Sequence, residues 1–224
     1  MYEEFYKNGI SDIDFKCNHL DDIMKNILQK KLKKGFNLNS KYPGAYDLRP
    51  NVFDYDPVFI DVLKKNNIKK LIKGITLKDM SLFHIQVRVV DKNNSYMDWH
   101  RDTYYNQDNK LVGKAPHGVK IIYYPDFDNQ EEDRLKYLMG SNRVLFPNNQ
   151  YDNELFKILN VKKIKASSSK AILFDVNGLH AVCPEKPNKK SIRLIYSFLD
   201  KKQIINDHNN EDVHTNAMKL YEDL

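Results

Sequence analysis

Two histidines and one aspartate carry the clearest chemical signal in the sequence. His100 and Asp102 lie two residues apart, and His180 ends a run, residues 171–180, that predicts a buried strand leading into a glycine turn. On a β-strand, residues i and i+2 face the same side, so the imidazole and the carboxylate can converge on one point and His180 can join them there. Two histidines and one carboxylate leave three positions of a metal ion open, which suits Fe(II) oxygen chemistry better than a closed zinc site.

An arginine, Arg193, stands thirteen positions after His180. Strand alternation in residues 191–197 places Arg193, Ile195 and Ser197 on one face. A guanidinium near a metal can form a bidentate pair with a carboxylate, and Ser197 can add a hydroxyl contact. This arrangement predicts a dicarboxylic co-substrate with one end on iron and the other end on Arg193.

A second polar face lies on the strand predicted at residues 83–89. The sequence alternates between apolar residues and the polar series His84, Gln86 and Arg88. A half-exposed sheet gives this pattern, and so does a barrel with a polar interior that holds a ligand. The metal-type motifs favour the barrel. We therefore regard Gln86 as a candidate co-substrate contact, and His84, Arg88 and Tyr104 as candidate substrate contacts.

The elements that must position these residues change along the chain. The first third predicts helices, because apolar residues from Leu20 to Leu28 recur at helical spacing before Gly35, and Pro57 suits the first turn of a second helix. From residue 82 the period becomes two, and a short helix is expected again at 210–224. The predicted strands after the first are at residues 96–102, 119–124, 143–146, 171–175 and 192–198.

This order of elements predicts the fold class. Strands that follow helices without βαβ alternation indicate antiparallel sheets with helices packed on one side, a mainly β protein of the α+β class. We expect one domain over residues 1–224, with helical support at 1–80, the β core at 81–200 and a C-terminal helix at 201–224. The irregular stretches at 37–57 and 103–118 are the candidates for a substrate lid.

Composition limits the classes of function. The chain has 224 residues, 41% of them hydrophobic and 29% charged, which is typical of a soluble globular protein. Its net charge of +6 comes mainly from lysines that we assign to solvated helix faces, so a nucleic-acid partner and a membrane partner are not expected. Cys17 and Cys183 suggest neither a disulfide framework nor a thiolate zinc site, and the protein is expected to be cytoplasmic.

The motifs together resemble those of the Fe(II)/2-oxoglutarate-dependent dioxygenases, and within them the phytanoyl-CoA dioxygenase-like branch. The resemblance rests on His100-Arg-Asp102, on His180 and Arg193, and on the turn Gly140-Ser-Asn-Arg143, over roughly residues 83–200. It implies a double-stranded β-helix, a jelly-roll or cupin-like barrel, with the N-terminal helices supporting one sheet. It also implies Fe(II) on the triad, 2-oxoglutarate on Arg193 with Ser197 and Gln86 as further contacts, and hydroxylation or another oxidation of a substrate by O2 with release of succinate and CO2. The two candidate lid segments are rich in Tyr, Asn and Asp, which favours a polar small molecule as the substrate.

The chain departs from the family pattern at two places, and two other functions stay open. Ile195 stands where the family usually has a serine after the arginine, and Asn142 replaces the histidine of the Gly-Ser-His turn. A cupin-like protein hydroxylase shares the triad and often binds 2-oxoglutarate through a lysine, for which Lys120 is the candidate. A non-catalytic binding protein with the same barrel is the third possibility. A protein kinase is excluded, because Gln107 stands where its catalytic loop needs asparagine and no glycine-rich loop precedes it.

Overall fold

The structure of the protein is a computed structural model. It describes most of the chain in segments, which are residues 2–15, 19–29, 36–38, 45–48, 52, 56–91, 97–105, 111–113, 118–125, 127, 134–145, 150–165, 170–182, 190–201 and 215–224. Cys17, Gly35 and Cys183 lie outside these segments, as does the side chain of Tyr104. Within the described segments, the helices are all too short or too polar to cross a bilayer.

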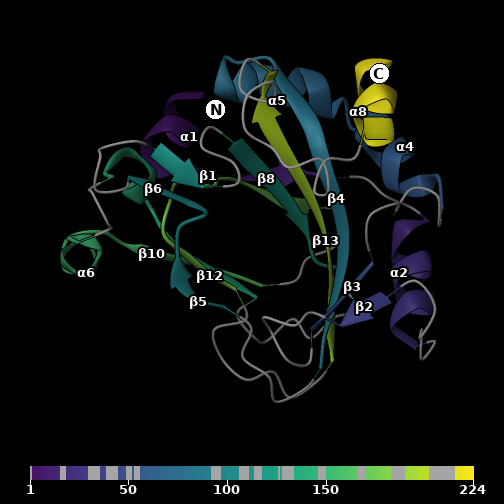
Figure 1. Ribbon diagram of the computed structural model, residues 1–224, viewed down its shortest axis with the longest axis horizontal. Helices are drawn as coiled ribbons and strands as arrows, with labels where there is room; N and C mark the ends of the chain where they lie inside the picture. The colour runs from purple at the N-terminus through teal and green to yellow at the C-terminus, as the bar shows by residue number, and fades with distance from the viewer. Residues whose placement is uncertain are drawn as a thin grey trace.

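A seven-stranded antiparallel sheet forms the centre of the fold (Figure 1). Its two longest strands, β4 and β13, are paired along their whole length. In spatial order the strands are β1 (Ile10–Asp14), β11 (Lys170–Asp175), β8 (Gly118–Tyr123), β13 (Ser191–Asp200), β4 (Met80–Val90), β3 (Ala45–Leu48) and β2 (Phe36–Leu38).

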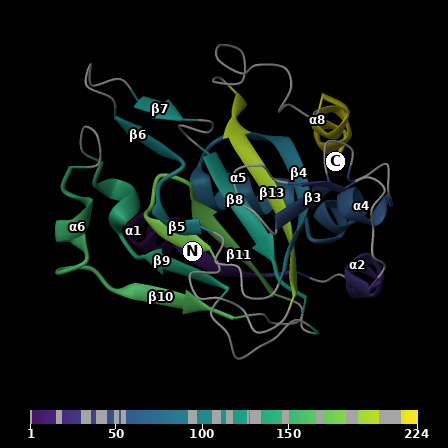
Figure 2. The ribbon, with the colours of Figure 1, turned by 60° about the horizontal axis from the view of Figure 1, so that its bottom comes forward.

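A smaller four-stranded antiparallel sheet faces one side of the large sheet, as the two views in Figures 1 and 2 show. Its strands, in spatial order, are β10 (Val161–Ile164), β9 (Leu135–Leu138), β12 (His180–Val182) and β5 (Met97–His100). A separate hairpin pairs β6 (Thr103–Tyr105) with β7 (Leu111–Gly113). Apolar residues of both sheets, among them Ile122, Ile195 and Tyr137, form one buried cluster, so the two sheets pack face to face.

Helices cover the opposite face of the large sheet (Figure 2). Leu194 and Tyr196 of β13 and Ile85 of β4 lie in the same buried cluster as Met24 and Ile72 from these helices. The helices are α1 (Tyr2–Asn8), α2 (Leu20–Gln29), α4 (Val58–Lys65), α5 (Ile68–Thr76) and α8 (Thr215–Glu222), and the short turns η1 (Ser141–Arg143) and α6 (Asp152–Leu155) lie elsewhere in the chain. The alternation on β4 and β13 thus separates an apolar face against helices from a polar face against the small sheet.

The predicted fold class is confirmed, and several predicted elements are confirmed with it. The helical stripe at Leu20–Gln29 is α2, Pro57 directly precedes α4, and α8 lies within the helix predicted at 210–224. The second predicted helix is divided in two, because Asn67 adopts a left-handed conformation with φ 50° between α4 and α5.

Other local predictions are wrong. The strand predicted at 143–146 does not form in residues 143–145, the part of it that the structure describes. Arg143 belongs to the 3₁₀ turn, and the carbonyl of Val144 accepts a hydrogen bond from the Arg101 side chain and not from the backbone of a neighbouring strand. The helical first third contains the strands β1, β2 and β3, two of them inside or beside the stretch expected to be a loop. Strands β9 and β10 were not predicted at all. Each is only four residues long and gains its order from pairing across the sheet.

Candidate metal centre

Strand pairing brings the two histidines together. His100 is the last residue of β5 and His180 is the first of β12, and the two are register partners in the small sheet. Their ring centroids are 4.3 Å apart. The sequence separates them by most of the β core, so their contact exists only because the two strands are neighbours.

Asp102 completes the group from just beyond the strand. Strand β5 ends two residues earlier than predicted, and Asp102 is positioned by its backbone N–H, which donates to the carbonyl of Val176 at 3.1 Å. One carboxylate oxygen, Oδ1, lies 3.9 Å from Nε2 of His100, and the other, Oδ2, lies 3.9 Å from Nε2 of His180. One ligand atom from each of the three residues lies within 4.8 Å of the others, which is a group that could hold a metal ion.

Hydrogen bonds orient both imidazoles for coordination. Nδ1 of His100 lies 2.7 Å from the carbonyl of Asp98, and Nδ1 of His180 lies 2.9 Å from the carbonyl of Gly178. A carbonyl accepts a hydrogen bond, so each ring carries a proton on Nδ1, and a neutral ring then has its lone pair on Nε2. Nε2 of both rings lies toward the carboxylate of Asp102, as a metal ligand requires.

The charge states also fit a metal ion. Burial and the neighbouring His100 lower the pKa of His180 to about 3, so its ring is neutral at physiological pH. Burial by itself raises the pKa of Asp102, but the charge and hydrogen bond of Lys120 outweigh it, helped by the histidines, and the pKa falls to about 2. Lys120 is the largest single cause of this lowering. Its Nζ lies 2.7 Å from Oδ2 of Asp102.

Arg101, between the two first ligands, was missed by the sequence analysis. Its side chain points away from the ligands and is buried, with 6% exposed. The guanidinium pairs with Asp152 at 2.8 Å and donates to the carbonyls of Ser141 at 2.8 Å, Val144 at 2.9 Å and Asn177. It therefore ties the His100–Asp102 segment to the 3₁₀ turn and to the loop that precedes His180. The only signal in the sequence was a charged residue inside a predicted strand.

The Gly140-Ser-Asn-Arg turn has a structural part in the same assembly. Ser141 donates to the carbonyl of Leu138 at 2.6 Å and accepts from the backbone N–H of Leu179 at 2.8 Å. Gly178 also packs closely, since a Cβ atom there would lie 1.9 Å from the Tyr137 hydroxyl oxygen. The backbone on the N-terminal side of His180 is thus held by hydrogen bonds and by close contact.

The predicted polar face is buried between the sheets. Arg193 and Ser197 are 1% and 2% exposed, and His84, Gln86 and Arg88 are 8%, 3% and 6% exposed. A half-exposed sheet is therefore excluded for this strand. In the register of β13 with β4, Arg193 stands opposite Arg88, and Ser197 stands opposite His84. Within the described part of the chain, the Nε2 of Gln86 is a buried donor that makes no hydrogen bond, as expected of a residue facing a ligand.

The positions of the cations define two ends of this inner face. Ser197 is also the register partner of Lys120 on β8, and Lys120 contacts Asp102, so this level of the sheet is the metal end. Arg193 lies four residues before Ser197 on β13, away from the metal end. The first candidate lid segment contains part of β2 and all of β3, and the second contains the β6–β7 hairpin. Most of their other residues, and the Tyr104 side chain, are outside the described structure.

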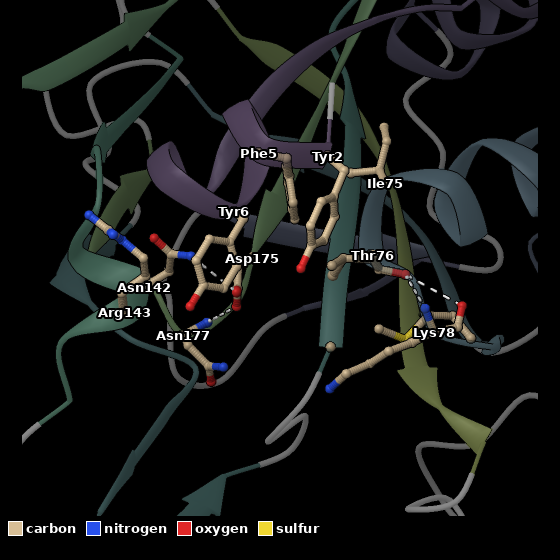
Figure 3. Close-up of a pocket in the computed structure, with 13 residues that line it drawn as sticks. Tyr2, Phe5, Tyr6, Ile75, Thr76, Lys78, Asn142, Arg143, Asp175 and Asn177 are labelled. Atoms are coloured by element: carbon tan, nitrogen blue, oxygen red, sulfur yellow. Dashed lines mark hydrogen bonds between the residues drawn. The ribbon is translucent and has the colours of Figure 1, made fainter.

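A separate cavity of about 330 Å³ lies on the helical side of the large sheet (Figure 3). Tyr2 and Tyr6 of α1, Lys78 and Asn177 are among its lining residues, and so is Asp175 at the end of β11. Burial raises the pKa of Asp175 to about 6, although the Asn177 backbone N–H and the Asn142 amide donate to its carboxylate. None of the residues that line this cavity belongs to the predicted site.

Comparison with known proteins gives a likeness in structure only. No protein-family model matches the chain, and no curated protein matches it. Among solved structures, AviO1 from Streptomyces viridochromogenes Tue57 is 15% identical with a TM-score of 0.66, over 89% of this chain and 93% of that one. HygX from Streptomyces hygroscopicus, with nickel and 2-oxoglutarate bound, is 14% identical with a TM-score of 0.66, over 90% and 87%.

SnoN, a non-haem alpha-ketoglutarate-dependent epimerase of nogalamycin biosynthesis, is 8% identical with a TM-score of 0.65, over 89% of this chain and 81% of that one. The chain shares the fold of these proteins. The structural likeness confirms the fold that the resemblance to Fe(II)/2-oxoglutarate-dependent enzymes implied, whereas the phytanoyl-CoA dioxygenase-like branch stays a prediction.

Proposed function

We propose that the protein is a non-haem Fe(II)- and 2-oxoglutarate-dependent oxygenase that hydroxylates, or otherwise oxidises, a polar small molecule. One observation carries this proposal. Two imidazoles, of which that of His180 is neutral, and an ionised carboxylate converge within 4.8 Å at the edge of the polar inner face of the large sheet. This donor set leaves open positions for a co-substrate and O2 on an iron ion. The fold is that of HygX, which binds nickel and 2-oxoglutarate, and of SnoN, which is alpha-ketoglutarate-dependent.

In this proposal His100, Asp102 and His180 hold the metal. Iron bound there with 2-oxoglutarate supplies O2-dependent oxidation, in which 2-oxoglutarate is converted to succinate and CO2. The protein keeps Nε2 of His180 unprotonated, keeps Asp102 ionised and excludes water from the inner face. The side chain of His180, with 2% exposed, lies on the closed side of the centre, whereas His100 and Asp102, with 23% and 18% exposed, leave an approach for substrate.

Arg193 is the proposed partner of the distal carboxylate of 2-oxoglutarate. Its buried guanidinium lies on the inner face, and a bidentate pair with a carboxylate matches its geometry. Ser197 and Gln86 are proposed as further contacts. His84, Arg88 and Tyr104 are proposed to contact the substrate. Lys120 is engaged with Asp102 at the metal end, which argues against the protein hydroxylases that bind the distal carboxylate through a lysine.

The proposal extends to the whole chain as one cytoplasmic domain that acts on small molecules. HygX has been solved with hygromycin B bound, so this fold accommodates a ligand beside the metal and 2-oxoglutarate. A small polar substrate agrees with the polar inner face, whose side chains offer charged and amide groups. SnoN is an epimerase, so oxidation without net hydroxylation stays within the proposed range.

The test is metal-dependent consumption of 2-oxoglutarate. We expect the purified protein, loaded with Fe(II), to convert 2-oxoglutarate to succinate slowly without substrate and to stop when O2 is removed. His100→Ala should abolish both iron binding and turnover, because one of three ligands is lost. His19→Ala is the matched control, since His19 is exposed. Full turnover by His100→Ala would overturn the proposal. Tight binding of iron and 2-oxoglutarate without any turnover would favour a non-catalytic binding protein.

A further inference from the structure

Lys120 lies in the metal centre without being a possible ligand of the metal. It comes from β8 in the middle of the large sheet and reaches across the space between the sheets to Asp102. Its Nζ lies 2.7 Å from Oδ2, the same oxygen that is 3.9 Å from Nε2 of His180. Asp102, the one anionic ligand of the metal site, is therefore also the ion-pair partner of Lys120.

This position has an electrostatic consequence. An ammonium group bound to Asp102 stabilises the metal-free centre and repels a divalent cation placed beside it, so Lys120 must weaken metal binding. Lys120 and Asp102 together carry no net charge, since the ammonium group balances the carboxylate at a distance of 2.7 Å. A divalent ion brings the centre to a charge of two, whereas without Lys120 it would bring it to one. An anion that joins the loaded centre is correspondingly better held when Lys120 is present.

The two described cations of β8 and β13 also stand at different levels of the inner face. Lys120 is level with Ser197, and Arg193 lies four residues before Ser197 on β13. A dicarboxylate whose one end is at the metal and whose other end is at Arg193 would place its two carboxylates at these two levels. Each carboxylate would then have its own cation.

We propose that Lys120 binds the 2-oxo-acid end of the co-substrate, and that it lowers the affinity of the centre for the metal ion while raising its affinity for that anion. This inference rests on the proposed function and adds a binding residue that the triad and Arg193 do not provide. It predicts opposite effects on two binding equilibria, which a structural role for Lys120 does not, since loss of structure weakens both.

The experiment compares Lys120→Met with Arg193→Met and with the control Lys162→Met. Lys162 forms a lysine–aspartate pair of similar length with Asp12, at 2.6 Å, on a different edge of the structure. Calorimetry gives the affinity of each protein for Ni(II), which is redox-inert here. It then gives the affinity of each nickel-loaded protein for 2-oxoglutarate and for 2-oxopentanoate, which has the same chain length but lacks the distal carboxylate.

We expect Lys120→Met to bind Ni(II) roughly tenfold more tightly and both 2-oxo acids roughly 10- to 100-fold more weakly. Arg193→Met should weaken 2-oxoglutarate alone, and Lys162→Met should match the wild type. Lys120→Arg keeps the charge and should bind both 2-oxo acids within a few-fold of the wild type. If Lys120→Met does not fold, Lys120→Gln, which keeps a polar side chain but removes the charge, makes the same test.

Several results would overturn the inference. Unchanged affinity of Lys120→Met for both 2-oxo acids would do so, as would weaker nickel binding by that variant, or a loss in Lys120→Arg as large as in Lys120→Met. Failure of the wild type to bind 2-oxoglutarate in the presence of nickel would instead refute the proposed function, and this inference with it. The two failures are therefore distinguishable from the wild-type measurement alone.

Discussion

Replacing Arg101 by methionine tests whether the support of the metal centre has been identified correctly. The substitution keeps an unbranched side chain of similar length but removes the guanidinium. Asp152 then loses its partner while only 14% of its side chain is exposed, and three backbone carbonyls lose a charged donor. Removing one member of a buried ion pair costs about 3–5 kcal/mol. Because three carbonyls also lose their donor, we expect this variant to lie toward the upper end of that range.

Urea denaturation of the metal-free protein measures this loss directly. We expect the free energy of unfolding of Arg101→Met to be about 4 kcal/mol lower than that of the wild type. Groups that orient metal ligands from behind typically contribute about 10- to 100-fold to metal affinity, so Ni(II) binding by the folded variant should weaken by that factor. Arg143→Met is the matched control, because Arg143 is an exposed arginine of the neighbouring turn. It should change neither quantity.

A small effect would refute this reasoning. If Arg101→Met unfolds within about 1 kcal/mol of the wild type, the contacts of the guanidinium do not hold the two segments together. Asp152→Asn provides a second test of the ion pair if the methionine variant cannot be purified in a folded form. It keeps the carbonyl contacts of Arg101 and should lose less stability, about 1–3 kcal/mol.

Two further predictions concern residues outside the ligand set. Burial raises the pKa of Asp175 from an ordinary 3.8 to about 6. The contribution of this protonated carboxyl to the stability of the folded protein is therefore fully present below pH 3.8 and is lost as the pH rises through 6. Asp175→Asn should therefore be more stable than the wild type at pH 8, by up to about 3 kcal/mol, and equally stable below pH 4, as urea titrations at both pH values would show; equal stability at pH 8 would contradict the prediction. Gly178→Ala should destabilise the protein by about 1–3 kcal/mol and weaken nickel binding, because its Cβ meets Tyr137 and its carbonyl orients His180. Its control, Gly74→Ala, adds a methyl group in open space within α5 and should stabilise by about 0.5–1 kcal/mol, and similar effects in both variants would refute the close-packing argument.

The structure supports the sequence prediction best where the signal is local and periodic. The alternation on β4 and β13 separates Ile85 and Leu194, which pack against helices, from Gln86 and Arg193, which face the other sheet. The amphipathic stripe of α2 likewise follows from residue spacing. Such patterns survive in the fold because each strand or helix must bury one face, whichever neighbours it acquires.

The errors lie where order comes from pairing. Strand β1 was read as part of a helical region, and its five residues are strand because they pair with β11. The segment at 143–146 has the composition of a strand, but the backbone groups of Arg143 and Val144 bond to Arg101 and to their own turn. Short segments have weak intrinsic preferences, so their tertiary partners decide their conformation.

The sequence alone determined which residues could form the metal centre. Histidine and carboxylate at strand spacing, a second histidine after a buried strand and an arginine on an alternating strand are properties of residue type and order. Only the tertiary structure decided that His100 and His180 are register partners and that Arg101 ties the His100–Asp102 segment to the 3₁₀ turn. It also decided that Lys120 of the large sheet reaches Asp102. The physical reason is that these contacts join residues far apart in the chain, and no local pattern encodes which strands become neighbours.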